Sequence, residues 1–207
     1  MTTNVYVDGP SLYYGALKDR PGRWLDLQTW CERLLPGQDV ERVRYFTAWA
    51  NPAFDQGPAI RQRVYLRALQ TSPKVSIHFG RCIKQRADLP EARRPHERRS
   101  VIKVRMKGVD VALTTELLAD VSDRDMDTAV LVTTDSDLRP PIAAVRSRGV
   151  RVGIVNPWRN QRLAHALHEY ADFFVRPPTS SYVEAGFPLE MSDENGTFRA
   201  PSSWVRR

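Results

Sequence analysis

The chain has 207 residues, of which 42% are hydrophobic and 27% charged, a composition typical of a folded globular domain with a substantial core. Its net charge of +7 favours a polyanionic partner, with nucleic acid first. No apolar run approaches the roughly 18 residues that span a membrane, and the N-terminus lacks the pattern of a signal peptide. We therefore expect a cytoplasmic protein with no membrane partner.

Strands and helices alternate in the predicted order of elements. Strands are expected at 3–7, 40–49, 75–83, 129–133, 150–155 and 172–175, with 101–105 as an edge strand, and helices are expected after 9–11 and at 27–35, 58–71, 109–121, 138–148 and 160–170. This alternation predicts an α/β fold with a mostly parallel sheet, right-handed crossovers and helices on both faces.

Two segments fall outside this alternation. Residues 84–100 are rich in arginine and contain two prolines, and we expect a loop or an open excursion there. Residues 1–176 should form the domain, while 177–207, richer in Pro, Ser and Gly, should form a C-terminal tail packed on it. Phe187 and Trp204 indicate that this tail is partly anchored.

Acidic residues follow two apolar strands and open one helix. Asp8 ends the first strand, Asp135 and Asp137 follow the strand at 129–133, and Asp110 opens the helix at 109–121. Open α/β sheets place their chemistry beyond the carboxyl ends of the strands, so these carboxylates are expected to converge. Like charges at close range oppose ionisation, and a bound cation removes that penalty. Ligation by oxygen alone suits Mg²⁺ or Mn²⁺.

Simpler explanations exist for several of the acids taken singly. Asp8 and Asp137 each stand where a carboxylate commonly caps the following helix. Glu116 and Asp120 are weaker candidates, because either can equally be a solvated helix acid. The neighbouring hydroxyls, Thr134 and Ser136, are weaker candidates as well.

A hard metal beside a basic surface points to phosphodiester hydrolysis. No Ser/His/Asp or Cys/His nucleophile set and no glycine-rich phosphate loop stands out. A bound metal lowers the pKa of a water and offsets charge in the transition state. Basic residues that are candidates to meet phosphate are Lys103, Lys107, Arg93, Arg94, Arg98 and Arg99. For the two lysines, edge-strand solubility is an equal alternative.

Three motifs in this order resemble the NYN domain, a PIN-like nuclease family that includes LabA-type proteins. They are residues 5–16, VYVDGPSLYYGA, residues 107–113, KGVDVAL, and residues 130–138, VLVTTDSDL, and the similarity continues through 171–174 and the tail. The resemblance implies a Rossmann-like, PIN-type α/β/α sandwich and cleavage of RNA that depends on Mg²⁺ or Mn²⁺. The family's metal-binding acids match Asp8, Asp110, Asp135 and Asp137.

The chain departs from the family pattern beside two of these acids. After Asp-Gly the family usually has an aromatic residue and then Asn, where this chain has Pro10 and Ser11. An Asn is also common before Asp-Ser-Asp, where this chain has Thr134. Ser11 can still donate a hydrogen bond to substrate. A metal-dependent ribonuclease is the leading interpretation; the alternatives are a catalytically weakened RNA-binding regulator and a protein-interaction module, and a homo-oligomer or protein partner stays open.

Overall fold

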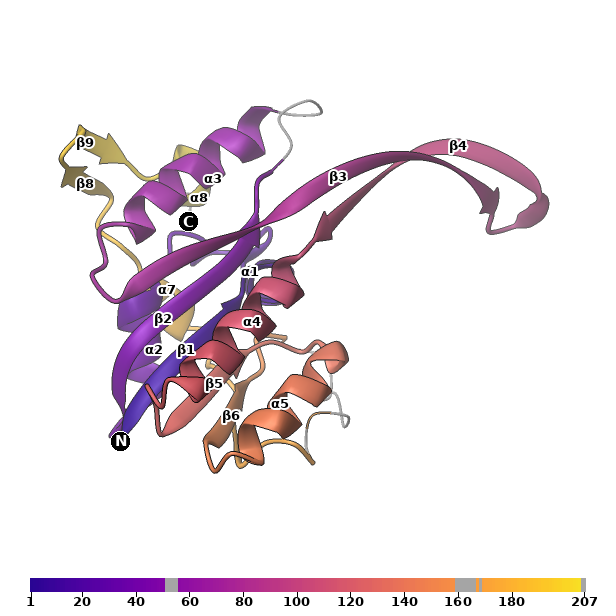
Figure 1. Cartoon of the computed structure of the whole chain (residues 1–207). Coiled ribbons are helices and arrows are strands. Elements are labelled where there is room, and N and C mark those ends of the chain that lie inside the picture. The colour runs from indigo at the N-terminus through magenta and orange to yellow at the C-terminus, as the bar shows by residue number, and fades with distance from the viewer. Residues whose placement is uncertain (51–55, 159–166, 168, 206–207) are drawn as a thin grey trace.

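The computed structural model describes residues 1–50, 56–158, 167 and 169–205. Within these residues, seven strands form one sheet in the order β4-β3-β2-β1-β5-β6-β7 (Figure 1). The strands are β1 (Thr2–Asp8), β2 (Asp39–Ala48), β3 (Val75–Glu91), β4 (Arg94–Lys107), β5 (Thr128–Val132), β6 (Arg151–Val155) and β7 (Phe173–Val175). Every neighbouring pair is parallel except β3 and β4. The predicted mostly parallel sheet is confirmed.

Helices cover both faces of this sheet. One side packs against α2 (Leu27–Leu34) and α3 (Gln56–Leu69), and the other against α4 (Val109–Ser122) and α5 (Arg139–Arg146). The core residues of β1 alternate accordingly, because successive side chains of a strand point to opposite faces: Val5 lies in the first core and Tyr6 in the second. The fold is an α/β/α sandwich, as predicted.

The helices that follow the acids are short. After β1 the chain forms one turn of α1 (Gly9–Leu12) and then a π-helix, Tyr13–Leu17. The helix predicted at 138–148 consists of a 3₁₀ turn, Ser136–Leu138, followed by α5. Most of the helix predicted at 160–170 lies outside the described residues.

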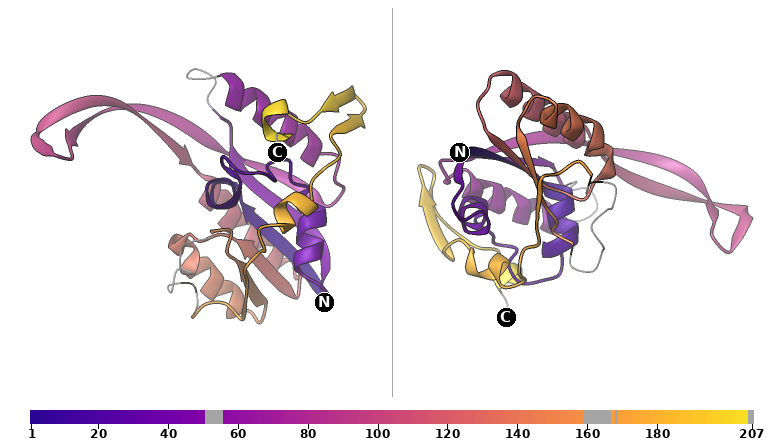
Figure 2. Two further views of the ribbon diagram at one scale, coloured as in Figure 1. Left: turned by 180° about the vertical axis from the view of Figure 1, so that it is seen from behind. Right: turned by 90° about the horizontal axis from the view of Figure 1, so that it is seen from below.

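Of the two alternatives predicted for 84–100, the loop is wrong and the open excursion is confirmed. β3 and β4 form one long antiparallel hairpin, which leaves the body of the molecule as a curved ribbon (Figures 1 and 2). We call residues 81–107 of this hairpin the arm. The two prolines that suggested a loop, Pro90 and Pro95, lie near the end of the hairpin, where Pro is tolerated because no further strand needs its missing N–H.

The end of the chain packs on the side of α2 and α3. It contains α7 (Ser181–Glu184), β8 (Glu190–Asp193), β9 (Gly196–Arg199) and α8 (Ser202–Val205). The ring of Phe187 is buried 5.7 Å from that of Trp24, and the ring of Trp204 lies 5.8 Å from that of Tyr65, centroid to centroid. This segment therefore closes one side of the core. None of the helices in the described ranges is long and apolar enough to span a membrane.

Candidate functional site

The carboxyl end of the sheet brings Asp8 beside the segment that follows β5. β1 and β5 are parallel neighbours, with Val7 opposite Val132, so the next residues of both strands lie side by side. The Thr133 hydroxyl donates to Asp8 Oδ2 at 3.0 Å. We call Asp8, Asp110, Asp135 and Asp137 the acid edge.

Asp8 is a buried carboxylate held by neutral donors. It is 4% exposed, and it accepts from Ser11 N at 3.1 Å and from Ser11 Oγ at 2.5 Å, besides Thr133. Burial raises the pKa of Asp8; the hydrogen bonds from Ser11 and Thr133 lower it, and the charge of Asp135 raises it further. In the part of the chain that the structure describes, no Lys or Arg forms an ion pair with Asp8.

Gly9 lets the chain turn tightly after Asp8. A Cβ added at Gly9 would lie 2.6 Å from the backbone oxygen of Phe46 on β2, closer than real Cβ contacts. The start of α1 therefore approaches β2 as only glycine permits. In this turn, the backbone N–H and the hydroxyl of Ser11 both donate to the Asp8 carboxylate.

Asp110 reaches the same edge from the start of α4. The preceding Gly108 has φ +80°, a left-handed conformation that turns the chain from β4 into the helix. Burial raises the pKa of Asp110, and the negative charges of Asp8, Asp135 and Asp137 raise it further. Asp110 therefore lies within electrostatic range of the other three predicted acids.

Thr133 is a site residue that the sequence interpretation missed. Its hydroxyl donates to Asp8 and accepts from Asp135 N at 3.0 Å, so it connects the two strand exits. The sequence did contain a signal for this role, because Thr133 directly follows an apolar strand and stands close to Asp135. Asp135 Oδ1 in turn accepts from Asp137 N at 2.9 Å. Asp8 therefore caps α1, and Asp135, in place of Asp137, caps the 3₁₀ turn Ser136–Leu138.

Glu116 and Asp120 lie apart from the acid edge, on Arg44 of β2. Asp120 is 3% exposed and accepts from Arg44 Nε at 2.9 Å and from the Tyr6 hydroxyl at 2.6 Å. Asn4 Nδ2 donates to the same Asp120 oxygen at 3.2 Å. Glu116 Oε2 lies 2.8 Å from Arg44 Nη1. The structure gives both acids a cationic partner, and it does not bring them to Asp8.

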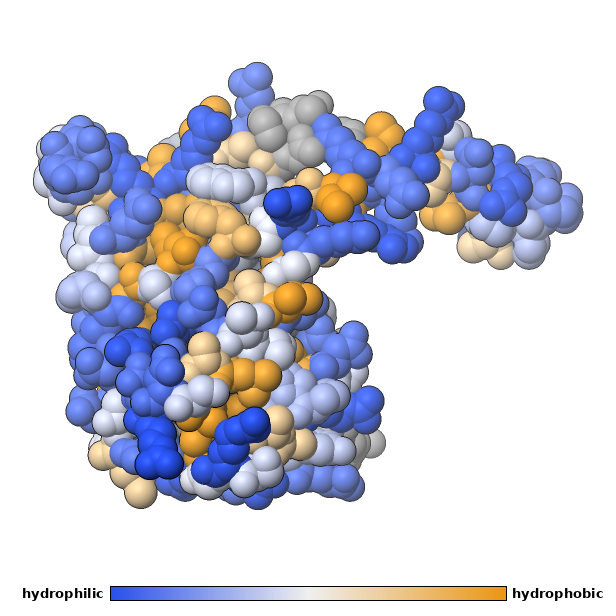
Figure 3. Space-filling view, viewed as in Figure 1, coloured by the Kyte–Doolittle hydropathy of each residue, from blue (hydrophilic) through white to orange (hydrophobic). Residues whose placement is uncertain are grey.

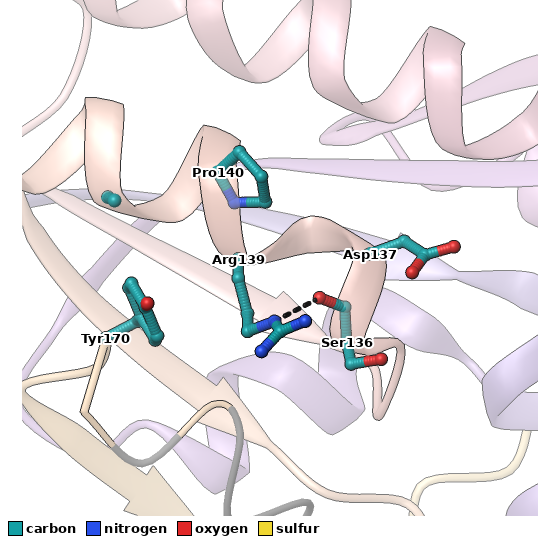
Figure 4. Close-up of a pocket in the computed structure, with 6 residues that line it drawn as sticks. Ser136, Asp137, Arg139, Pro140 and Tyr170 are labelled. Atoms are coloured by element: carbon teal, nitrogen blue, oxygen red, sulfur yellow. Dashed lines mark hydrogen bonds between the residues drawn. The ribbon is translucent and has the colours of Figure 1, made fainter.

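The remaining hydroxyl candidates flank the acids. Thr134 is half-buried between Thr133 and Asp135. Ser136 and Asp137 border a surface pocket of about 430 Å³, whose other lining residues are Arg139, Pro140, Ala143 and Tyr170 (Figure 4). Arg139 Nε donates to the Ser136 carbonyl oxygen at 3.0 Å, and Figure 4 shows the Asp137 carboxylate pointing away from Arg139.

The predicted basic residues all lie on the arm. Lys107 is exposed at its base, three residues before Asp110, and Lys103 is half-buried further out. Near the tip, Arg94 pairs with Glu97 and Arg99 with Glu91. The residues that complete this predicted set, Arg93 and Arg98, are exposed.

The acid edge is not a preformed cage for a metal ion. Across the described ranges, no group of three or more His, Cys, Asp or Glu is arranged to hold a metal. Mg²⁺ usually keeps several waters and binds proteins through only one or two carboxylates. The Asp8 carboxylate is buried, has no Lys or Arg partner among the described residues, and interacts electrostatically with Asp110 and Asp135, so it offers the kind of ligand that such an ion prefers. The residues therefore fit a hydrated divalent cation.

The fold and this edge define a Rossmann-like α/β domain of the PIN-like class. The family model of the NYN domain matches residues 2–177, and the chain belongs to that family, whose members are typically nucleases and usually associated with RNA.

Comparison with known proteins gives a curated relative and a solved structure that are similar to the chain. The chain is 29% identical over 195 residues to the 6-hydroxy-3-succinoylpyridine 3-monooxygenase HspA of Pseudomonas putida (strain DSM 28022 / S16). The matched region covers 78% of this chain and 61% of the relative. The chain thus spans about three fifths of that protein's length. The structure of VPA0982, a protein of unknown function from Vibrio parahaemolyticus RIMD 2210633, matches with a TM-score of 0.56 at 18% identity, covering 86% of this chain and 93% of that one. At this identity the likeness shows the fold alone.

Proposed function

We propose that the chain is a metal-dependent ribonuclease that hydrolyses RNA phosphodiesters at the acid edge. What supports the proposal is that Asp8 and Asp135 follow neighbouring parallel strands, and that the charges of Asp8, Asp135 and Asp137 act on Asp110. These residues would hold Mg²⁺ or Mn²⁺, which supplies an activated water and charge stabilisation when bound.

The chain's own residues prepare the carboxylates. Ser11 and Thr133 hold Asp8 in one orientation, and their hydrogen bonds favour its ionised form against the effect of burial. Because the Ser11 hydroxyl is occupied by Asp8, we assign it to positioning of that carboxylate ahead of contact with RNA. Lys103, Lys107 and the four arginines near the arm tip are proposed to bind the RNA backbone.

Cleavage of a labelled single-stranded RNA with Mn²⁺, with Mg²⁺ and with EDTA tests the proposal. We expect cleavage that requires the metal and is lost in Asp135→Asn. Asp123→Asn is the matched control, because it removes the same charge at the far end of α4, where Asp123 is exposed. Cleavage that persists in EDTA or in Asp135→Asn would refute the proposed site.

Two other results would redirect the assignment. Salt-sensitive RNA binding without cleavage would favour a catalytically weakened RNA-binding regulator, an alternative that the departures at Pro10 and Ser11 support. Absence of both binding and cleavage would favour testing the oxygenase chemistry that the name of the Pseudomonas relative suggests, since one fold can host unrelated activities.

A further inference from the structure

All of the chain's net charge lies on the arm. Residues 81–107 contain ten of the 31 Lys and Arg residues and three of the 24 Asp and Glu residues, an excess of +7, which equals the net charge of the whole chain. The remainder of the chain therefore has a formal net charge of zero. Figure 3 shows the arm as a mostly hydrophilic projection with scattered apolar side chains.

The two faces of the arm differ in charge. The hairpin register runs without a break from Arg81 opposite Lys107 to Pro90 opposite Arg98, and residues directly opposite each other share a face. One face carries five cations, Arg81, Lys107, Arg105, Lys103 and Arg99; the other carries three, Lys84, Arg86 and Arg98. We call the first the ladder face. Apolar side chains are exposed on both faces, so charge distinguishes them.

The ladder is concentrated on one strand. On β4, cations stand at 99, 103, 105 and 107, and Val101 occupies the one intervening position on this face. Alternate residues of a strand are about 7 Å apart, so the charges form a row along the ribbon. The row ends at Lys107, from which the chain continues to Asp110.

An exposed pair of stacked aromatic rings stands at the base of the same face. The rings of Trp49 and Phe79 lie 4.6 Å apart, centroid to centroid, with an interplanar angle of 6°. They are 47% and 42% exposed. Phe79 precedes Arg81 by two residues on β3 and therefore shares its face. Large exposed rings of this kind are the usual platforms for unstacked bases.

We propose that the ladder face and the Trp49–Phe79 pair form a binding site for a single strand of RNA. This inference rests on the proposed function and specifies its substrate class. A basic track that follows the backbone, combined with aromatic rings that take bases, is how proteins bind single strands. Bases inside a duplex are stacked on one another and are not available to the rings. The ladder would lead the strand toward the acid edge.

Two double variants test which face binds. Lys103→Gln with Arg105→Gln removes two charges from the ladder face, and Lys84→Gln with Arg86→Gln removes the same two charge types from the other face. Binding of a labelled oligouridylate of about 20 nucleotides, longer than typical single-strand sites, is measured in EDTA over a series of salt concentrations. For the ladder variant, the plot of log affinity against log salt should become shallower by about 1.4, since each lost phosphate contact contributes about 0.7. The control variant should keep the wild-type slope.

Trp49→Ala tests the aromatic platform. We expect an affinity loss of about 5- to 150-fold, the range for one stacked base, and near-wild-type binding for Trp49→Phe, which keeps a ring. Circular dichroism of each variant checks that the fold is intact. Equal slope changes from the two faces, no change from either, unaltered affinity in Trp49→Ala, or tighter binding of a duplex of equal length would each overturn the inference.

These outcomes separate the inference from the proposed nuclease. Because binding is measured in EDTA, ladder-dependent binding without any cleavage keeps the inference and removes the nuclease. Metal-dependent cleavage with equal effects from both faces keeps the nuclease and removes the inference.

Discussion

Replacing Asp110 by Asn should change stability in opposite directions with and without a divalent cation. In the described residues, no hydrogen bond is made by the Asp110 carboxylate, so the substitution removes a charge and breaks no hydrogen bond. Burial and the charges of Asp8, Asp135 and Asp137 oppose its ionised form. In EDTA near pH 7, Asp110→Asn should therefore raise the free energy of unfolding. With Mn²⁺, the wild type should gain clearly more stability than the variant gains.

The metal-dependent gain can be estimated from linkage. At a free Mn²⁺ concentration of 100 times Kd, binding adds about 2.7 kcal/mol to the free energy of unfolding. A domain of this size melts about 2–4 °C higher per kcal/mol, so the wild-type Tm should rise by about 5–11 °C. A tenfold loss of affinity in Asp110→Asn would reduce the gain at the same Mn²⁺ concentration to about 1.4 kcal/mol, half the wild-type effect.

Differential scanning fluorimetry in EDTA and over a Mn²⁺ series measures both effects. Asp123→Asn is again the matched control and should show the full wild-type Mn²⁺ shift. If Asp110→Asn melts lower than the wild type in EDTA and keeps the full Mn²⁺ shift, Asp110 stabilises the start of α4 and does not bind metal, and the reasoning fails.

Three further predictions concern pH, the second acid cluster and the arm tip. The folded-state pKa values of Asp8 and Asp110 are raised. In EDTA, the stability that these two carboxyls contribute is therefore fully present below the ordinary pKa of 3.8 and is lost as the pH rises. In melts from about pH 4 to 7, the Tm of Asp110→Asn should increasingly exceed that of the wild type. Asp120→Ala leaves Arg44 without its buried partner, so urea denaturation should show a free energy of unfolding lower by about 3–5 kcal/mol. The Mn²⁺-induced rise in Tm should stay unchanged. If a stable Asp120→Ala variant loses that rise, Asp120 belongs to the metal site. Four arginines near the tip can be replaced together by Gln: Arg93, Arg94, Arg98 and Arg99. This variant should bind two unrelated RNA sequences more weakly than the wild type, by the same factor for each. Unchanged affinity would remove the tip from the binding model.

The strand exits of the site were predictable because burial leaves a strong signal. Apolar runs before Asp8 and Asp135 indicate fully buried strands, and parallel strands bring their carboxyl ends to one edge. The sequence did not predict the hydrogen bonds of Thr133, which depend on the exact register of β1 against β5. It also left open the partner of Asp120, because Arg44 lies 76 residues away in the chain.

Residues 84–100 of the arm were not predicted as strand, for the opposite reason. Hydrophobic alternation marks a strand when one face is buried, and both faces of the arm are exposed. Its apolar residues therefore alternate with cations on both faces, and the composition looks like that of a loop. The β3–β4 pairing also joins residues up to 26 positions apart, Arg81 and Lys107, which no local pattern reveals.

The arm and the acid edge are parts of one construction, joined at the start of α4. β4 ends at Lys107, Gly108 turns the chain, and Asp110 follows in the first helical turn. A Cβ at Gly80 would lie 2.6 Å from the Lys107 backbone oxygen and 2.7 Å from Val109, so β3 presses directly on this turn. The contact fixes the base of the arm relative to the Asp110 backbone. If RNA binds along the arm as proposed, this contact would hold it at a defined position relative to Asp110.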